Sequence, residues 1–556
     1  MEKDSRRTRF PERKGTFVLF AIVVLLIRLW MLRNMPIYAI ENSGHDDKMM
    51  VDIAHSLGNG GPAYSQYALV KGWMFPLYLR IVRLLRIPYI QSIHILNAAL
   101  SVLTVYALNE KKVRPFHYFL YLALVFNPVF ASVEVMMRVY RNAFSALMAF
   151  TVVIAMIAVY LRRMESKKSI IPWLLLASIA LPAFWYSRED SIWLLPFLLG
   201  VIAVTTICVA LRDKKRAAVL LVCMLLPIFS LEATTMLTRL HRQIKYGEPI
   251  VNELSEGSFP DVMKAIYAVQ MEQEEPLYVD ASRAKIRLLY EHSETLKALS
   301  PYLEAQMDRW SQYGRLEQNH QNKEVENGWF FWCLRSTVSK SGGFGSLRES
   351  QEVFAQIARE LETAIDEGKL KTRAVMPSAL MPPWKPSTSQ RLMDAFLDIV
   401  NYVPSFSDVN MSVPISWGDP MVIGRFEDIT GNTAVHHDED AYAVKAEQSM
   451  KMQRIVLNVY QRIWPVISWM GRIAAALCAL LLLRKNKDKG ALVERIWILA
   501  GVLGALLTLY VGVAYNHAES CHSITVLYLS AAYALVIFFD LLALDTLWIS
   551  GKKCLK

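Results

Sequence analysis

Long apolar runs separated by short basic loops constrain this chain more than any other feature. A helix needs about 20 mainly apolar residues to cross a bilayer, because every backbone N–H and C=O must be paired inside lipid. The hydrophobic fraction of 54% also exceeds that of ordinary soluble proteins. We therefore expect an all-α polytopic membrane protein with about ten transmembrane helices. They are predicted over residues 16–32, 90–108, 116–133, 142–161, 170–185, 191–211, 217–237, 463–483, 491–515 and 523–544.

The positive charge of the chain is concentrated in loops and is not spread over one surface. The net charge is +11, and its Lys and Arg residues cluster at 6–14, 111–114, 162–168, 212–216 and 484–489. In a topology with ten spans all these clusters fall on one side, which the positive-inside rule makes cytoplasmic. We expect a multi-pass protein of the cell membrane with both termini in the cytoplasm, and no nucleic-acid partner.

Composition divides the chain into three parts. Residues 1–237 form a transmembrane module whose first outer loop covers 35–89. Residues 238–462 are charged and carry amphipathic repeats at 281–299 and 349–367, which predict a largely helical domain outside the membrane. Within it, the Trp- and Phe-rich stretch 326–336 is expected to lean on the membrane or on the transmembrane core. Residues 463–556 supply the last three spans and a cytoplasmic tail.

The first outer loop carries the strongest candidate for chemistry. Asp46 and Asp47 are adjacent, and Lys71 follows before the aromatic run Phe75-Pro-Leu-Tyr78. A carboxylate at a membrane surface is able to take a proton from an acceptor hydroxyl beside a lipid-borne donor. This pattern favours a membrane-embedded glycosyltransferase.

Two further groups of charges are candidate phosphate ligands. Arg138 and Arg141 are three residues apart, so a helical turn would place both on one side, where they would grip a phosphate in fork geometry. The alternative is a pair of interfacial arginines that reach toward headgroups. Arg188, Glu189 and Asp190 lie between two apolar runs, where charges are costly unless paired or solvated. Arg188 would bind phosphate with either acid as its orienting partner; the alternative is a solvated turn.

Other polar residues near the expected outer ends of spans have a supporting role. His94 and Asn97 share a helix face and either line the same cavity or form a helix–helix hydrogen bond. His522, in the last outer loop, either contributes a donor or base or satisfies helix ends. Arg28, near the outer end of the first span, either extends to the surface, which is the favoured interpretation, or faces a polar cavity and holds a phosphate.

The sequence predicts no cofactor, and a divalent metal is left open. Residues 436–440 combine imidazole and carboxylate groups that suit zinc or manganese. Adjacent residues seldom bind one ion together, so a solvated acidic loop is the favoured interpretation. Cys333 and Cys521 both face outward in the expected topology, and free thiols are favoured over a disulfide between them.

These motifs resemble the GT-C superfamily of polytopic glycosyltransferases, which includes protein O-mannosyltransferases and aminoarabinose transferases. The resemblance lies in His45-Asp46-Asp47 and in Lys71 ahead of Phe75-Pro-Leu-Tyr78, within the first 240 residues. It implies a donor sugar on a polyprenyl phosphate, and a glycan, lipid or protein acceptor outside the cytoplasm. It also implies inverting transfer with Asp46 or Asp47 as general base. The implied phosphate contacts are Lys71, Arg138 and Arg188. The chain departs from the family in its Asp-Asp pair, where Asp-Glu is usual.

Two other functions compete with this one. A non-catalytic transporter or flippase of lipid-linked saccharides would also need cationic residues facing a cavity, although the inverted repeats typical of transporters are not apparent. A membrane scaffold would use the helical outer domain to bind a protein. Walker A, GxGxxG, HExxH and GxSxG motifs do not occur in a meaningful context, which argues against ATP-driven transport and the common hydrolases.

Overall fold

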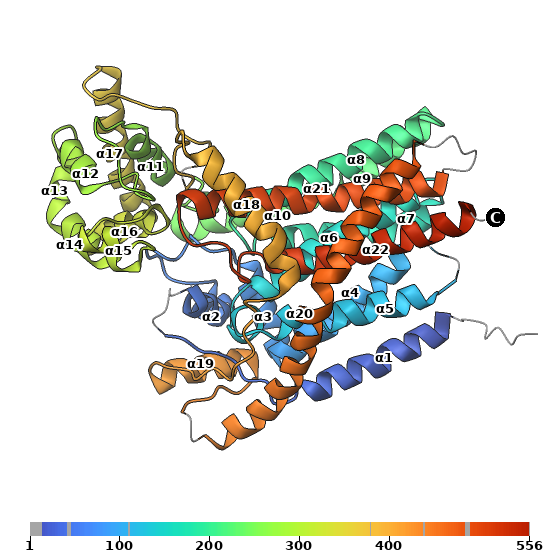
Figure 1. Ribbon diagram of the computed structural model, residues 1–556. Helices are drawn as coiled ribbons and strands as arrows, with labels where there is room; N and C mark the ends of the chain where they lie inside the picture. The colour runs from blue at the N-terminus through green and yellow to red at the C-terminus, as the bar shows by residue number, and fades with distance from the viewer. Residues whose placement is uncertain are drawn as a thin grey trace, which may run out of the picture.

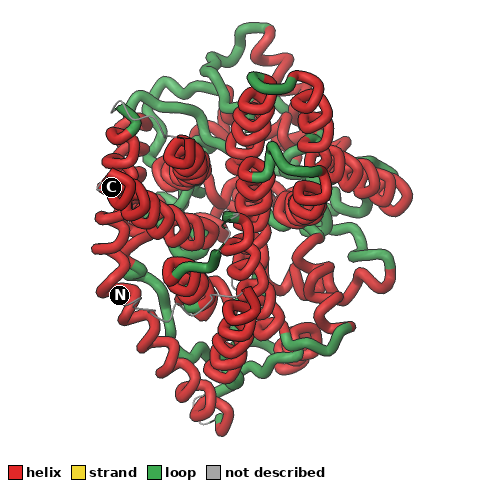
Figure 2. The backbone as a smooth tube through the Cα atoms, turned by 90° about the vertical axis from the view of Figure 1, so that its right-hand side faces the viewer, coloured by secondary structure: helices red, strands yellow, loops and turns green. Residues whose placement is uncertain are grey.

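The computed structural model describes residues 14–41, 46–108, 110, 112–378, 380–437, 440–483 and 490–554. Across these ranges the chain is helical, and the pairings of extended backbone are isolated bridges such as Tyr38 with Arg138 and Ile40 with Trp417. Figure 2 shows helices joined by loops throughout the molecule. The predicted all-α class is confirmed.

Eight helical segments are long and apolar enough to cross a membrane. They are α4 (Tyr89–Ala107), α6 (Asn142–Leu161), α7 (Lys167–Trp185), α8 with its preceding turn (Ser191–Ala210), α9 and α10 (Lys214–Tyr246), α20 (Ala441–Leu481), α21 (Gly490–Glu519) and α22 (Ser530–Gly551). Two shorter apolar helical segments, Gly15–Met31 in α1 and Pro115–Ala131 beginning with α5 (Pro115–Val125), coincide with the other two expected spans. The membrane class is thus confirmed, while the count of ten stays a prediction.

Helix α6 forms the centre of the bundle. Nearly every one of its residues is buried, from Asn142 to Tyr160, and it packs against α4, α7, α8 and α22. A helix that is apolar on all sides is stable only when other helices surround it. The residues just before α6 are therefore held firmly at one end of the bundle core.

The two ends of the bundle differ. Helix α1 (Lys14–Met31) begins and α22 ends at one end, opposite the helices α11–α17 (Figure 1). At this terminal end Arg114 donates to both oxygens of Asp545 at 2.7 Å and to Glu110 at 2.6 and 2.8 Å. Arg495 also bonds to Asp545, at 2.8 Å, and to Glu110. This neutral network ties α5, α21 and α22 together. Which side of a membrane the terminal end faces stays a prediction.

Seven helices lie beyond the opposite end, and we call them the helical module. They are α11 (Ser258–Ala268), α12 (Arg283–Tyr290), α13 (Glu294–Ala298), α14 (Ser300–Trp310), α15 (Glu317–Gln321), α16 (Asn327–Lys340) and α17 (Leu347–Asp366). All of them except α15 contribute to a second hydrophobic core, which also includes Met49 and Val70 from the segment between α1 and α4. The module is anchored to the segment between α1 and α4 by Arg335, which donates to the carbonyl oxygen of Gln66 at 2.7 Å. Arg335 also donates to Glu253, just before α11, at 3.0 Å, and both side chains of this pair are fully buried.

The segment between α1 and α4 contains two helices, α2 (Asp46–Ser56) and α3 (Met74–Leu84). They pack against α19 (Pro420–Thr430), while α18 (Thr388–Ser405) packs against α20, α21 and α22. Helices α10 (Leu226–Tyr246) and α20 run through the expected boundaries at 237/238 and 462/463. Both expected boundaries therefore fall inside helices.

Arg28 does not extend to the surface, so that prediction is wrong. Its side chain is 0% exposed, and it lies on the buried face of α1 together with Phe17, Ala21 and Val24. The spacing of these residues places Arg28 on the seam that packs against the rest of the bundle. The position of the residue near a helix end therefore did not decide the direction of its side chain.

Candidate functional site

Asp47 is buried in a bidentate ion pair. It lies in the first turn of α2, and its two carboxylate oxygens accept from Nε and Nη2 of Arg138 at 2.8 and 2.6 Å. The Asp47 side chain is 0% exposed. Burial would lower the pKa of Arg138, but the Asp47 carboxylate raises it above its ordinary value. Both oxygens of Asp47 are occupied, so we assign this residue a structural part in the site.

Asp46, the preceding residue, is only partly engaged. Its Oδ2 atom accepts from Lys71 Nζ at 3.0 Å and from the Tyr140 hydroxyl at 2.9 Å. Its Oδ1 atom accepts no hydrogen bond from the residues described, and 26% of the side chain is exposed. Asp46 is therefore the carboxylate with an oxygen left for a ligand.

Glu189, in the turn after α7, contacts Lys71 of the segment between α1 and α4. It forms a bidentate pair with Arg141, at 2.7 and 2.6 Å, and lies 3.7 Å from Lys71 Nζ. Burial would raise the pKa of Glu189, but Arg141 and Lys71 together lower it to about 2. Lys71 thus lies between two carboxylates, Asp46 and Glu189.

Arg188 and Asp190 form a third bidentate pair, with both contacts at 2.7 Å. Arg188 also donates to the side-chain oxygen of Asn142 at 3.3 Å, which ties the pair to the start of α6. The Arg188 side chain is nearly buried, whereas the Asp190 side chain is 47% exposed. Another anion would therefore replace Asp190 at Arg188 with less rearrangement than it would need to replace Asp47 at Arg138 or Glu189 at Arg141.

The structure brings the main predicted residues together. We call the eight of them the charged cluster: Asp46, Asp47, Lys71, Arg138, Arg141, Arg188, Glu189 and Asp190. Its four cations and four anions leave no net charge. An added phosphate must therefore displace a carboxylate or occupy the space beside it, because each cation already has a partner. His45 lies outside the described residues.

Arg138 and Arg141 do not share a helical turn, so that prediction is wrong. A π-helical turn over Val133–Met137 ends at Arg138, whose extended backbone bridges to Tyr38. Arg141 then caps α6. The two guanidinium groups bind different carboxylates, Asp47 and Glu189, and lie 5.5 and 4.9 Å from the Tyr140 ring centre.

Three aromatic residues of the site were not predicted. Tyr140 bonds Asp46, and Trp332 of the helical module lies with its ring centre 5.8 Å from Lys71 Nζ. Tyr528, before α22, lies within electrostatic range of Tyr140 and Asp46. Tyr140 lies between Arg138 and Arg141 in the sequence, and this position could have identified it as a residue of the site. Trp332 belongs to the aromatic stretch 326–336, which packs against the segment between α1 and α4. The ring centre of Trp332 is 5.9 Å from that of Tyr67.

The supporting residues lie elsewhere. Asn97 donates to the carbonyl oxygen of Leu124 at 3.1 Å, which is the expected helix–helix hydrogen bond. His94 is buried near Arg28, and His522 is exposed beside His517, with ring centres 5.2 Å apart. Among the described residues neither histidine forms a hydrogen bond or ion pair with the charged cluster.

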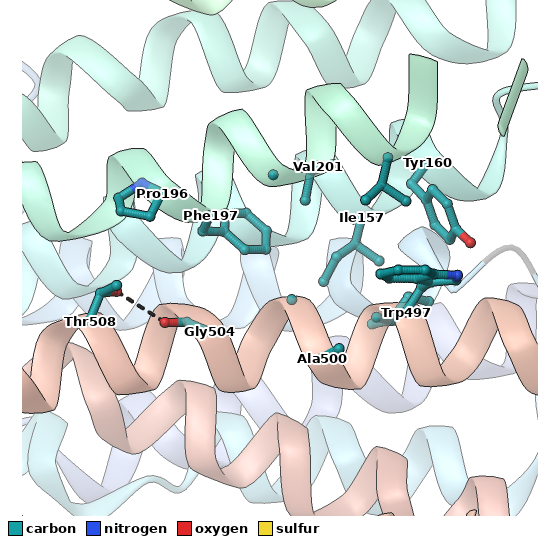
Figure 3. Close-up of a pocket in the computed structure, with 13 residues that line it drawn as sticks. Ile157, Tyr160, Pro196, Phe197, Val201, Trp497, Ala500, Gly504 and Thr508 are labelled. Carbon is teal, nitrogen blue, oxygen red and sulfur yellow. Dashed lines mark hydrogen bonds between the residues drawn. The ribbon is translucent and has the colours of Figure 1, made fainter. Parts of the chain in front are cut away.

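Other candidate sites receive no support. The described part of the chain contains no group of three His, Cys, Asp or Glu residues placed to hold a metal; Asp438 and Glu439 fall outside it. Cys333 and Cys521 are free thiols. A cavity of about 290 Å³ between α6, α8 and α21 is lined by apolar groups such as Phe197 and Trp497, with Thr508 at one end (Figure 3). It contains no charged side chain and is separate from the charged cluster.

Gly72 allows Lys71 to approach the turn after α7, and a substitution there is expected to disrupt the site. A Cβ atom at Gly72 would overlap the backbone carbonyl of Tyr186, which accepts from the Met74 amide at 3.3 Å. We expect Gly72→Ala to lower the free energy of unfolding by about 1–3 kcal/mol, as overpacking does. It should also move Lys71 away from Glu189. Thermal unfolding in detergent checks this, with Gly424→Ala as the control, since Gly424 has open space around it. Equal loss in both variants would contradict the steric argument.

Comparisons of the chain with protein-family models, with curated proteins and with solved structures give no match. The likeness to GT-C enzymes therefore depends on the short motifs of the first 240 residues. What the geometry adds is a cluster of paired charges in which Asp46 keeps one oxygen free of partners from the described residues.

Proposed function

We propose that this protein is a membrane glycosyltransferase that moves a sugar from a polyprenyl-phosphate donor to an acceptor outside the cytoplasm. One observation carries the proposal. Among the four carboxylates of the charged cluster, Asp46 alone has an oxygen without a partner in the described chain, while Asp47, Glu189 and Asp190 are each held at both oxygens by an arginine. A general base needs such a free oxygen within reach of the hydroxyl it deprotonates.

In the proposed reaction Asp46 acts on the acceptor hydroxyl, whereas Lys71 and Arg188 act on the phosphate that leaves. Asp46 Oδ1 takes the proton of the acceptor hydroxyl as its oxygen forms a bond to the anomeric carbon. The bond from that carbon to the phosphate oxygen breaks, and its electron pair leaves with the polyprenyl phosphate. Lys71 and Arg188 stabilise the charge that develops on the phosphate, because fixed cations away from bulk water need little reorganisation. Attack on the face opposite the phosphate inverts the anomeric centre.

The direct test is transfer by purified protein. Proteoliposomes would receive polyprenyl-phosphate hexoses and pentoses with labelled sugars, together with glycan, lipid and peptide acceptors. The proposal predicts a new glycosidic bond and an equal amount of released polyprenyl phosphate. Movement of the intact donor across the bilayer without a new bond would instead establish the transporter function.

A substitution at Asp190 tests how the donor phosphate binds. Because Asp190 competes with the donor phosphate for Arg188, we expect Asp190→Asn to lower the KM for the donor by about tenfold, and Arg188→Met to raise it. Steady-state kinetics over a range of donor concentrations measure both. The control is Glu494→Gln, which removes a similarly exposed carboxylate from Arg163 at the terminal end. A higher KM in Asp190→Asn would contradict displacement of this carboxylate.

A further inference from the structure

Arg28 occupies a position where the packing of α1 calls for an apolar residue. It lies on the same buried seam as Phe17, Ala21 and Val24, and it is 0% exposed. The opposite face of α1 is exposed and apolar, and it includes Leu19, Ile22, Val23, Leu26, Ile27 and Trp30. Figure 1 shows α1 at the edge of the bundle. Arg28 is therefore a charge held inside the protein, one helix away from the surrounding lipid.

The residues around Arg28 do not neutralise it. Its Nη1 atom donates to Gln453 Oε1 on α20, and its guanidinium carbon lies 5.4 Å from the Phe126 ring centre. His94 and Tyr460 lie within electrostatic range. Among the described residues no carboxylate forms an ion pair with Arg28, unlike Arg138, Arg141 and Arg188. An arginine keeps its charge in a protein, so a buried one without an anionic partner is costly.

The free edge of Arg28 has the geometry of an oxyanion site. Its Nε and Nη2 atoms are buried and have no hydrogen-bond partner among the described residues. In Arg138 and Arg188 these same two atoms hold both oxygens of a carboxylate. Two more buried groups that lack a partner in the described part of the chain belong to adjoining residues: Nδ2 of Asn127, which follows Phe126, and Oγ of Ser449, one helical turn before Gln453. Both are potential donors to an anion.

We infer that Arg28 binds the phosphate or carboxylate group of a lipid where the buried face of α1 meets Phe126 and Gln453. A planar fork of two N–H groups matches two oxygens of one such group. Arg28 lies only one helix away from lipid, because the opposite face of α1 is exposed and apolar. The site involves no residue of the charged cluster, so it goes beyond the proposed transfer reaction and stands or falls without it.

The test compares lipid retention by the full chain with two matched variants. Native mass spectrometry of protein extracted in mild detergent would be applied to wild type, Arg28→Met and Arg33→Met. Arg33 is exposed and stacks on Trp30, with its guanidinium carbon 4.6 Å from the ring centre, so it controls for loss of a positive charge nearby. We expect wild type and Arg33→Met to retain an anionic lipid, and Arg28→Met to lose it. Equal retention in all three would overturn the inference.

A second measurement separates a lipid from a free anion and does not depend on how Arg28→Met folds. Delipidated wild type, Arg28→Met and Arg28→Lys would be heated with dodecyl phosphate or with inorganic phosphate. Stabilisation of wild type by dodecyl phosphate alone identifies a lipid site, and stabilisation by both identifies an oxyanion site also open to the free ion. Arg28→Lys keeps the charge but loses the fork, so its affinity should fall by about tenfold or more. Failure of both anions to stabilise wild type, or the same response in Arg28→Lys, would refute the assignment.

Discussion

Asp46→Asn is expected to reduce the rate of sugar transfer by about 10²–10⁴-fold while the protein folds normally. This is the usual contribution of a general base. An amide oxygen still accepts hydrogen bonds from Lys71 and Tyr140, which now bond Asp46 at 3.0 and 2.9 Å, but it does not take up a proton at neutral pH. The turnover number measures the effect, and KM for the donor should change little.

Asp52→Asn is the matched control for this substitution. Asp52 lies on the same helix and pairs with Lys48 at 2.7 Å and with Arg425 at 3.0 Å, outside the charged cluster. The same chemical change there should leave transfer intact. If Asp46→Asn retained full activity, Asp46 would not be the base.

Asp47→Ala is expected to cost about 3 kcal/mol of stability, the low end for a buried pair, because it leaves the Arg138 guanidinium, whose side chain is only 22% exposed, without its anionic partner. The pair is bidentate at 2.6 and 2.8 Å and Asp47 is fully buried. Removing both partners together in Asp47→Leu/Arg138→Met should recover most of the loss, since two buried charges are replaced by apolar groups. Thermal unfolding of the three variants in detergent measures this.

This comparison also separates the parts played by the two aspartates. A double variant at Asp47 and Arg138 that is stable and still transfers sugar would establish that Asp47 has a structural part and is not the base. A single Asp47→Ala variant as stable as wild type would contradict the interpretation of the pair. A stable double variant that was as inactive as Asp46→Asn would move the base to Asp47.

The long apolar helices were predictable because the thickness of a bilayer fixes how many apolar residues a spanning helix needs. The expected span 142–161 coincides with α6, Asn142–Leu161, since bilayer thickness and apolar run length fix both ends. The charged residues of the site were also recognisable, because ionisable groups beside apolar spans are costly without partners. Arg188, Glu189 and Asp190 were found by this argument, and each has a partner in the structure.

The pairing of those residues was not predictable from local patterns. Asp47 and Arg138 are 91 residues apart, and only the fold brings them together. The spacing of Arg138 and Arg141 suggested a helical turn, but the bridge from Arg138 to Tyr38 imposes an extended backbone there. Trp332 reaches Lys71 from another part of the chain, so its position depends on how the helical module docks. Arg28 was misjudged because a helix end does not show which face a neighbouring helix covers.

The most direct test of the account is a structure of Asp46→Asn with a polyprenyl-phosphate sugar bound, since the variant should hold the donor without consuming it. The account predicts the donor phosphate within about 3 Å of Arg188 or Lys71, with Asp190 turned away. The sugar should lie beside residue 46, with room for an acceptor hydroxyl next to its side chain. A donor phosphate bound away from the charged cluster, or a sugar out of reach of residue 46, would contradict the account.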